Sequence, residues 1–170
     1  MNRTILHYPD KRLRNKGERV TSVTPAIREL VNDMAETMYA APGVGLAATQ
    51  IGVAYQLFVI DVAAEDEPSD LRVFINPEIL ERHDAVSWTE GCLSFPGVSE
   101  EVERAARVRV RAQDQDGKWF ELEAEGLLAV AVQHEYDHLQ GVLMIDHLGP
   151  LKKRLVNRKM QRRPSADVEA

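Results

Sequence analysis

The chain has 170 residues, of which 44% are hydrophobic, and it carries a formal net charge of −6. This length suits one domain spanning residues 1–170 and is too short for two ordinary domains. A single cysteine excludes an intrachain disulfide and indicates a reducing compartment. The apolar residues near the start are interrupted too early for a targeting signal, and no run reaches membrane-spanning length. We therefore expect a cytoplasmic protein that binds neither membranes nor, given its negative charge, DNA.

The first predicted element is a helix. Thr24 and Pro25 suit an N-cap and a first helical residue, and apolar residues then recur at helical spacing until Pro42 and Gly43 end the pattern. The segment that follows, residues 43–52, contains too many glycines and alanines for an ordinary strand and is too apolar for a solvated loop. We expect its backbone to pack closely against another group.

Strands are predicted in the middle of the chain. Residues 55–61, 72–76 and 79–81 have the composition of short strands. Residues 108–112 and 120–124 alternate between apolar and polar side chains on either side of an Asp-Gly turn. This last pair indicates a β-hairpin.

Two further helices are predicted in the last third of the chain. One runs from near Glu125 to Gly141, and its first half is almost entirely apolar, which indicates a central buried helix. Residues 150–163 form a basic C-terminal helix, and residues 164–170 are expected to be a disordered tail. The whole pattern predicts an α+β fold in which mainly antiparallel strands pack around the central helix, followed by a C-terminal helix.

The central helix contains the run HEYDH, from His134 to His138. A spacing of four residues places both imidazoles on one helix face, where they can bind one metal ion with Glu135 beside it. A pair of surface histidines is the alternative, but an otherwise apolar helix rarely carries three ionisable groups without a reason. Asp137 is suited to hold a neighbouring group in place, although the sequence does not identify its partner.

A catalytic metal ion needs a third protein ligand and one open position. The extended zinc-protease motif would place a third histidine at position 144, which is Met144, so that arrangement is excluded. His147 lies beyond the helix and suits a cap or the surface. Cys92, within the run EGCLS, is the remaining soft ligand. A lone cysteine is usually an inert core thiol, but its glycine neighbour and the missing third ligand favour ligation here.

Three motifs make this chain resemble the bacterial peptide deformylases. They are GVGLAATQ at residues 43–50, EGCLS at 90–94 and QHEYDHLQG at 133–141, and none departs from the family's pattern. The resemblance implies a metal-dependent hydrolase that removes the formyl group from the N-terminal formyl-methionine of nascent polypeptides and releases formate. It implies one divalent ion per chain, with Fe(II) favoured and with Zn(II), Ni(II) and Co(II) as alternatives.

The resemblance also assigns roles to individual residues. It implies metal ligation by Cys92, His134 and His138, acid–base catalysis by Glu135, and oxyanion contacts from Gln50 and from the backbone amide of Leu93. A glutamine inside such a segment is otherwise more often a tether for the backbone.

The resemblance also implies a pocket for the methionine side chain beside the metal. Three of its residues lie seven, four and three positions before His134, so they share its helix face and form an apolar wall. Ordinary core packing is the alternative for every member of the set. The expected substrate-binding residues are Leu127, Val130, Ala131, Val44, Gly45 and Trp88.

Two charged segments leave alternatives open. Residues 97–104 are acidic, and they either border the cleft or form the solvated edge of a strand. The C-terminal helix is basic, with Leu151, Leu155 and Met160 as an apolar stripe for docking on the domain. Its basic face is either a solvated helix end or a contact for ribosomal RNA, whose phosphates need no sequence-specific recognition. The basic residues are Lys152, Lys153, Arg154, Arg158, Lys159, Arg162 and Arg163.

Two other functions are weaker. A zinc endopeptidase using the same helix is disfavoured by the cysteine ligand, the absence of an export signal and the short chain. A structural metal-binding domain is disfavoured because structural zinc sites normally use four protein ligands, and only three converge here.

Overall fold

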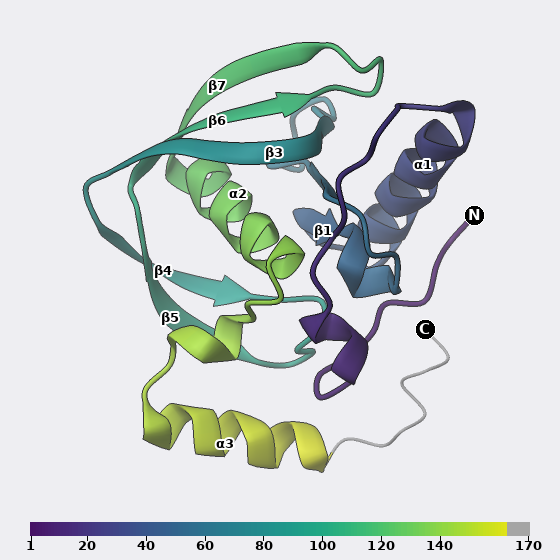
Figure 1. Cartoon of the computed structure of the whole chain (residues 1–170). Coiled ribbons are helices and arrows are strands. Elements are labelled where there is room, and N and C mark those ends of the chain that lie inside the picture. Colours follow the sequence, from purple (N-terminus) through teal and green to yellow (C-terminus); the bar gives the residue numbers. More distant parts are fainter. Residues whose placement is uncertain (163–170) are drawn as a thin grey trace.

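The computed structural model describes residues 1–162 (Figure 1). Arg163 and the predicted disordered tail, residues 164–170, lie outside the described residues. The helices are α1 (Pro25–Ala40), α2 (Gly126–Leu139) and α3 (Pro150–Gln161), with short 3-10 helices η1 (Lys11–Arg14), η2 (Ala48–Ile51) and η3 (Met144–His147). The strands are β1 (Gly45–Ala47), β2 (Leu57–Ile60), β3 (Arg72–His83), β4 (Val86–Gly91), β5 (Ser99–Arg104), β6 (Arg107–Gln113) and β7 (Trp119–Glu125).

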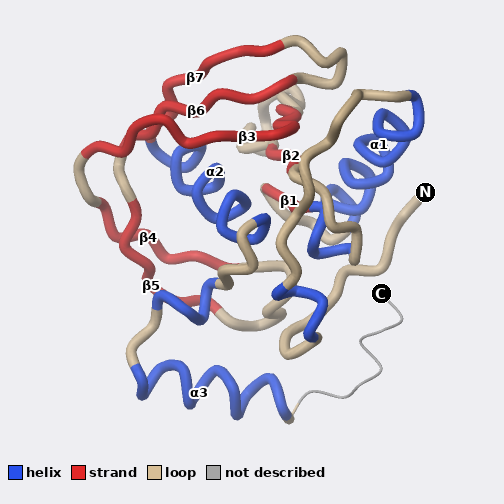
Figure 2. Tube along the Cα trace, viewed as in Figure 1, coloured by secondary structure: helices blue, strands red, loops and turns tan. Residues whose placement is uncertain are grey.

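The strands form two antiparallel sheets. The larger sheet has the order β1-β2-β3-β6-β7, and β4 pairs with β5 in a separate sheet. Helix α2 lies between the two sheets, α1 lies at the β1 end of the larger sheet, and α3 lies beyond β5 (Figures 1 and 2). The predicted α+β fold with a central helix is therefore confirmed. Within residues 1–162, no helix is both long and apolar enough to cross a membrane.

Strand β2 shows how the larger sheet is buried on both faces. Its four residues, LFVI, are all fully buried, and successive side chains of a strand point to opposite faces. Leu57 and Val59 join the apolar cluster around α1, whereas Phe58 and Ile60 join the cluster that contains α2. A continuous apolar run is what a strand covered on both sides requires.

The first helix begins as predicted. The Thr24 hydroxyl accepts a hydrogen bond from the Ile27 amide at 3.3 Å, and Pro25 is the first helical residue. The helix ends at Ala40, before Pro42. Its buried face packs against β1 and β2.

Strand β3 differs from the prediction of two short strands. The chain continues through Pro77 because Asn76 adopts a left-handed backbone, with φ of 53°, and the pairing with β6 shifts register there. The Asn76 side chain stabilises this bend through hydrogen bonds with Val20 and Gln113. A proline usually interrupts a strand, and the bulge at this position accommodates Pro77.

Helix α3 docks through a different stripe from the predicted one. Val156 and Met160 are buried, whereas Leu151 is 66% exposed and Leu155 is 51% exposed. Both pairs have a spacing of four residues, so each defines a stripe along the helix. The prediction holds for Met160 and was wrong for the two leucines, because helical spacing alone does not decide which stripe faces the apolar cluster that Val156 and Met160 join.

Candidate metal centre

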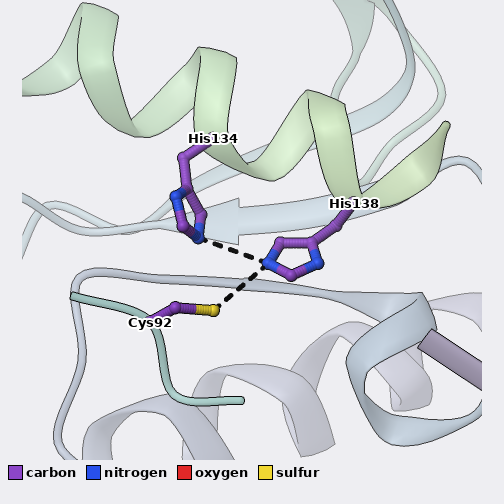
Figure 3. A group of neighbouring side chains, drawn as sticks. All are labelled: Cys92, His134 and His138. Atoms are coloured by element: carbon purple, nitrogen blue, oxygen red, sulfur yellow. Dashed lines mark hydrogen bonds between the residues drawn. The ribbon is translucent and has the colours of Figure 1, made fainter. Parts of the chain in front are cut away.

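The end of β4 and the second half of α2 bring three potential ligand atoms together (Figure 3). Cys92 follows β4 directly, and His134 and His138 lie one turn apart on α2. The Cys92 Sγ lies 3.4 Å from His138 Nε2, which lies 3.2 Å from His134 Nε2, and all three atoms lie within 4.8 Å of one another. Three vertices of a tetrahedron around a zinc-sized ion are separated by about 3.3–3.6 Å, given its usual bond lengths. The donor set therefore fits one such ion.

The ring of His134 is oriented by a carboxylate. His134 Nδ1 lies 2.9 Å from Glu90 Oε1. Burial alone would raise the pKa of Glu90, but hydrogen bonds from Arg104 and His134 outweigh burial and hold this pKa at about 2. An ionised carboxylate can only accept, so Nδ1 donates. In the neutral imidazole Nε2 then carries the lone pair, on the side of the other two candidate ligand atoms.

Glu135 lies beside the ligands without a counter-charge bonded to it. Glu135 as a whole residue is 4% exposed, and its Oε1 makes no hydrogen bond with any residue in the range 1–162. Burial raises the pKa of Glu135 to about 7, although the neighbouring His134 lowers it. A Cβ atom on Gly45 would lie only 2.6 Å from Glu135 Oε2, so the carboxylate packs against the β1 backbone. The predicted close packing of the small-residue segment is thus present.

Gln50 is held at both ends of its amide. Its Oε1 accepts from the Ala47 amide at 2.9 Å, and its Nε2 donates to the Ser94 hydroxyl at 3.0 Å and approaches Cys92 Sγ at 3.7 Å. Gln50 therefore does tether the backbone, which was the alternative to an oxyanion contact. The same hydrogen bonds direct its amide nitrogen toward Cys92 Sγ. Leu93, whose side chain packs against Gly43, follows Cys92 directly.

A cavity of ≈ 880 Å³ opens beside the ligands. Of the residues predicted to carry the chemistry, His138 alone is absent from its wall, and it is 1% exposed. The cavity joins an apolar wall to a few polar groups, which is typical of a small-ligand site. The six residues predicted to bind the substrate all line it: Val44, Gly45, Trp88, Leu127, Val130 and Ala131.

A hydrogen-bonded network of charged side chains lies behind His134, and the sequence did not predict it. Arg104 contacts Glu90 through Nε and Nη2 at 2.8 and 2.9 Å, and contacts Asp137 Oδ2 through Nη1 at 2.6 Å. His147 Nε2 lies 2.8 Å from the same Asp137 oxygen, so this surface residue anchors the network. The sequence did contain one signal: Asp137 lies in a largely apolar helix without an identified partner. Because a buried carboxylate needs a positively charged partner, Asp137 indicated a cation nearby.

The acidic segment after Pro96 was predicted either to border the cleft or to form the solvated edge of a strand, and it does both. Gly97, Val98 and Ser99 line the cavity, while residues 99–104 form strand β5. Glu101 and Glu103 are exposed on that strand. The segment therefore borders the cavity only where it begins.

Comparison with known proteins identifies relatives of this chain. A family model for polypeptide deformylase matches residues 2–154. The chain is 54% identical over 159 residues to peptide deformylase 1 of Burkholderia multivorans, which covers 93% of this chain and 87% of that protein. A crystal structure of a peptide deformylase from Legionella pneumophila is 44% identical with a TM-score of 0.90, over 96% of this chain and 100% of that one. A peptide deformylase from Synechococcus elongatus in complex with actinonin is 40% identical with a TM-score of 0.88, over 96% and 90% of the two chains.

The matched region contains every part of the site described above. Residues 43–50, 90–94 and 133–141 all fall within it, which confirms the resemblance that these motifs indicated. The chain therefore belongs to the peptide deformylase family of metal-dependent hydrolases, which remove the formyl group from the N-terminus of nascent polypeptides.

Proposed function

We propose that Cys92, His134 and His138 hold one divalent ion per chain and that Glu135 is the acid–base residue of deformylation. One observation carries this assignment: a buried, unpartnered carboxylate oxygen of Glu135 lies beside three converging ligand atoms, among the residues described. A buried polar atom without a partner is costly unless a ligand or water satisfies it. A site that hydrolyses an amide needs both features together.

When bound, the ion lowers the pKa of water and polarises a carbonyl oxygen. Glu135 takes a proton from the attacking water, whose oxygen forms a bond to the formyl carbon. The bond between that carbon and the methionine nitrogen then breaks, and Glu135 passes the proton to the leaving nitrogen. The second proton of the water passes from the formic acid to the released amine. The products are therefore formate and a methionyl ammonium group, so atoms and charges balance.

Two neutral donors are proposed to stabilise the negative oxygen that develops during attack. Gln50 Nε2 is suited to this role because Ala47 and Ser94 fix its orientation, and the Leu93 backbone amide follows the Cys92 ligand. Donors that are held in place before the reaction need no reorganisation when charge develops. Neither adds a charge to the buried site.

The apolar part of the cavity is proposed to bind the methionine side chain of the substrate. Leu127, Val130 and Ala131 form the wall on α2, one to two turns before His134, and Trp88 extends the wall from β4. Val44 and Gly45 line the cavity at β1. An unbranched apolar side chain would enter this slot without losing solvation of a charge.

Fe(II) is proposed as the native ion. One thiolate and two imidazoles suit both Fe(II) and Zn(II), so ligand chemistry does not choose between them. The family resemblance favours Fe(II), with Zn(II), Ni(II) and Co(II) as alternatives.

The outer face of α3 is proposed to contact the ribosome, where nascent formyl-methionyl peptides emerge in the cytoplasm. Lys152 lies 3.7 Å from Glu100, and Lys159 donates to the Gly97 carbonyl, so these two lysines bind the chain itself. Arg154 and Arg158 are exposed and line a shallow hollow along the helix. Clustered arginines of this kind bind phosphates regardless of sequence.

Replacement of Glu135 by glutamine tests the acid–base assignment. We expect Glu135→Gln to lower kcat by about 10²–10⁴-fold, because proton transfer is lost, while metal content stays near one ion per chain. Formate release and metal analysis on the same preparation measure both. Glu121→Gln, an exposed carboxylate on β7, is the control and should leave kcat unchanged. Activity of Glu135→Gln within tenfold of the unmodified chain would remove Glu135 from this role.

Metal exchange tests the identity of the ion. We expect the Fe(II) form to be active and to lose activity in air, because Fe(II) and the Cys92 thiolate both oxidise, whereas the Ni(II) and Co(II) forms keep their activity. Formate release before and after exposure to air measures this, with samples kept without oxygen as the control. Equal and air-stable activity of the Zn(II) form would contradict the proposal.

Charge removal on α3 tests the ribosome contact. Truncation would remove Val156 and Met160 from the core, so substitution of Arg154, Arg158 and Arg162 by glutamine is the cleaner change. We expect co-sedimentation with ribosomes to weaken at least about tenfold and the binding of the unmodified chain to fall steeply with salt. Formate release from a short peptide should be unchanged. The matched control removes three positive charges elsewhere, at Arg107, Arg109 and Arg111; equal weakening by both variants would exclude α3 as the contact.

A further inference from the structure

The most deeply buried charge cluster of the described chain lies behind the metal centre. Arg104, at the end of β5, directs one edge of its guanidinium at both oxygens of Glu90 and its remaining nitrogen at Asp137. The side chains of Arg104 and Glu90 are each 4% exposed, and that of Asp137 is 18% exposed. Three segments of the chain, β4, β5 and α2, therefore meet in one hydrogen-bonded unit.

We propose that Arg104 is a positioning residue for the metal centre, acting through Glu90 to fix the orientation of the His134 ring. The inference rests on the proposed ligand set of Cys92, His134 and His138. Glu90 Oε1 accepts from Arg104 Nη2 and from His134 Nδ1, so one oxygen joins the guanidinium to the ligand. A ligand histidine whose second nitrogen donates to a fixed carboxylate is held in one tautomer and one ring orientation.

The fork geometry of arginine is the essential feature. Two parallel N–H bonds, at 2.8 and 2.9 Å, stop the Glu90 carboxylate from rotating about its last torsion. A lysine ammonium carries the same charge but is a single point with no planar fork. It cannot hold both Glu90 oxygens and also reach Asp137 with the same geometry.

The opposite end of the unit is anchored as well. Asp137 immediately precedes the ligand His138, yet its carboxylate binds Arg104 and His147 and is not among the converging ligand atoms. His147 lies in η3, which follows α2 in the chain. Arg104 is thus held between two carboxylates that come from different elements, and this fixes its own position.

The ligands differ in how they are held. His134 has its Nδ1 bonded to Glu90, whereas His138 Nδ1 has no hydrogen-bond partner among residues 1–162 and relies on packing. Stability alone is a weak reason to bury such a cluster, since apolar side chains of similar volume are often as stabilising as a buried ion pair. A requirement to orient His134 explains why these charges lie inside the protein.

The test uses the Co(II)-loaded chain and the variant Arg104→Lys, which keeps the charge and removes the fork. We expect a chelator to remove Co(II) at least about tenfold faster from Arg104→Lys, a loss in the range that partners of metal ligands produce. The ligand-field bands of Co(II) should also shift, because the His134 ring is less well oriented. Both readouts are independent of turnover.

Arg3→Lys is the matched control. Arg3 also makes two N–H contacts with one carboxylate, Asp33, but on α1 and away from the ligands. This variant should change the free energy of unfolding without changing the Co(II) spectrum or the rate of metal removal. The comparison of the two variants separates the effect of losing any two-bond arginine–carboxylate contact from the effect of losing the one at Arg104.

A double-mutant cycle tests whether Arg104 acts through Glu90. In a Glu90→Gln background, Arg104→Lys should change the rate of Co(II) removal by less than about threefold, because the connecting carboxylate is already gone. Wild-type spectrum and removal rate in Arg104→Lys would overturn the proposal, as would an equal effect in both backgrounds. If Glu90→Gln does not fold, the comparison of Arg104→Lys with Arg3→Lys decides alone. Failure of the unmodified chain to show thiolate-to-Co(II) charge transfer would instead refute the ligand set.

Discussion

The hydrogen bond from His134 Nδ1 to Glu90 connects the metal centre to the rest of the fold. Glu90 lies two residues before Cys92, so one short segment at the end of β4 supplies both a proposed ligand and the acceptor that orients another proposed ligand. Helix α2 supplies the two imidazoles, the carboxylate proposed for acid–base catalysis and one wall of the cavity. The proposed ligands therefore come from two segments, the end of β4 and helix α2, which the bond between Glu90 and His134 holds together.

The pKa values of two buried glutamates beside this centre are shifted in opposite directions. Glu90 and Glu135 are both at most 5% exposed, so burial opposes the charged form of each. Arg104 and His134 hold the pKa of Glu90 at about 2, whereas the pKa of Glu135, which has no guanidinium bonded to it, is raised to about 7. One carboxylate is thus suited to a fixed structural contact and the other to exchanging a proton.

Local patterns in the sequence predicted much of this arrangement. The cap at Thr24, the apolar first half of α2 and the alternation across the β6–β7 hairpin are short-range signals, and all three elements were predicted. The four-residue spacing of the histidines required no tertiary information either. The motif EGCLS supplied Cys92 as the third ligand, which the structure brings to the imidazoles.

Features that depend on distant contacts could not be predicted. The pairing of β4 with β5, the continuation of β3 through Pro77 and the partners of Asp137 are set by segments far apart in the chain. The docking stripe of α3 was predicted wrongly for its two leucines, because the cluster that buries Val156 and Met160 is built from distant segments and helical spacing does not reveal it. Arg104 and His147 can be read from the sequence, but their closeness in space cannot.

The central claim is that an apolar slot for the substrate's first side chain ends at the proposed ligands and Glu135. Rates of formate release from two short peptides, one beginning with formyl-methionine and one with formyl-aspartate, test it most directly. The account predicts that kcat/KM for the methionine peptide is higher by at least about 100-fold, because the aspartate would lose its solvation on entering the slot. Comparable values of kcat/KM for the two peptides would contradict the account.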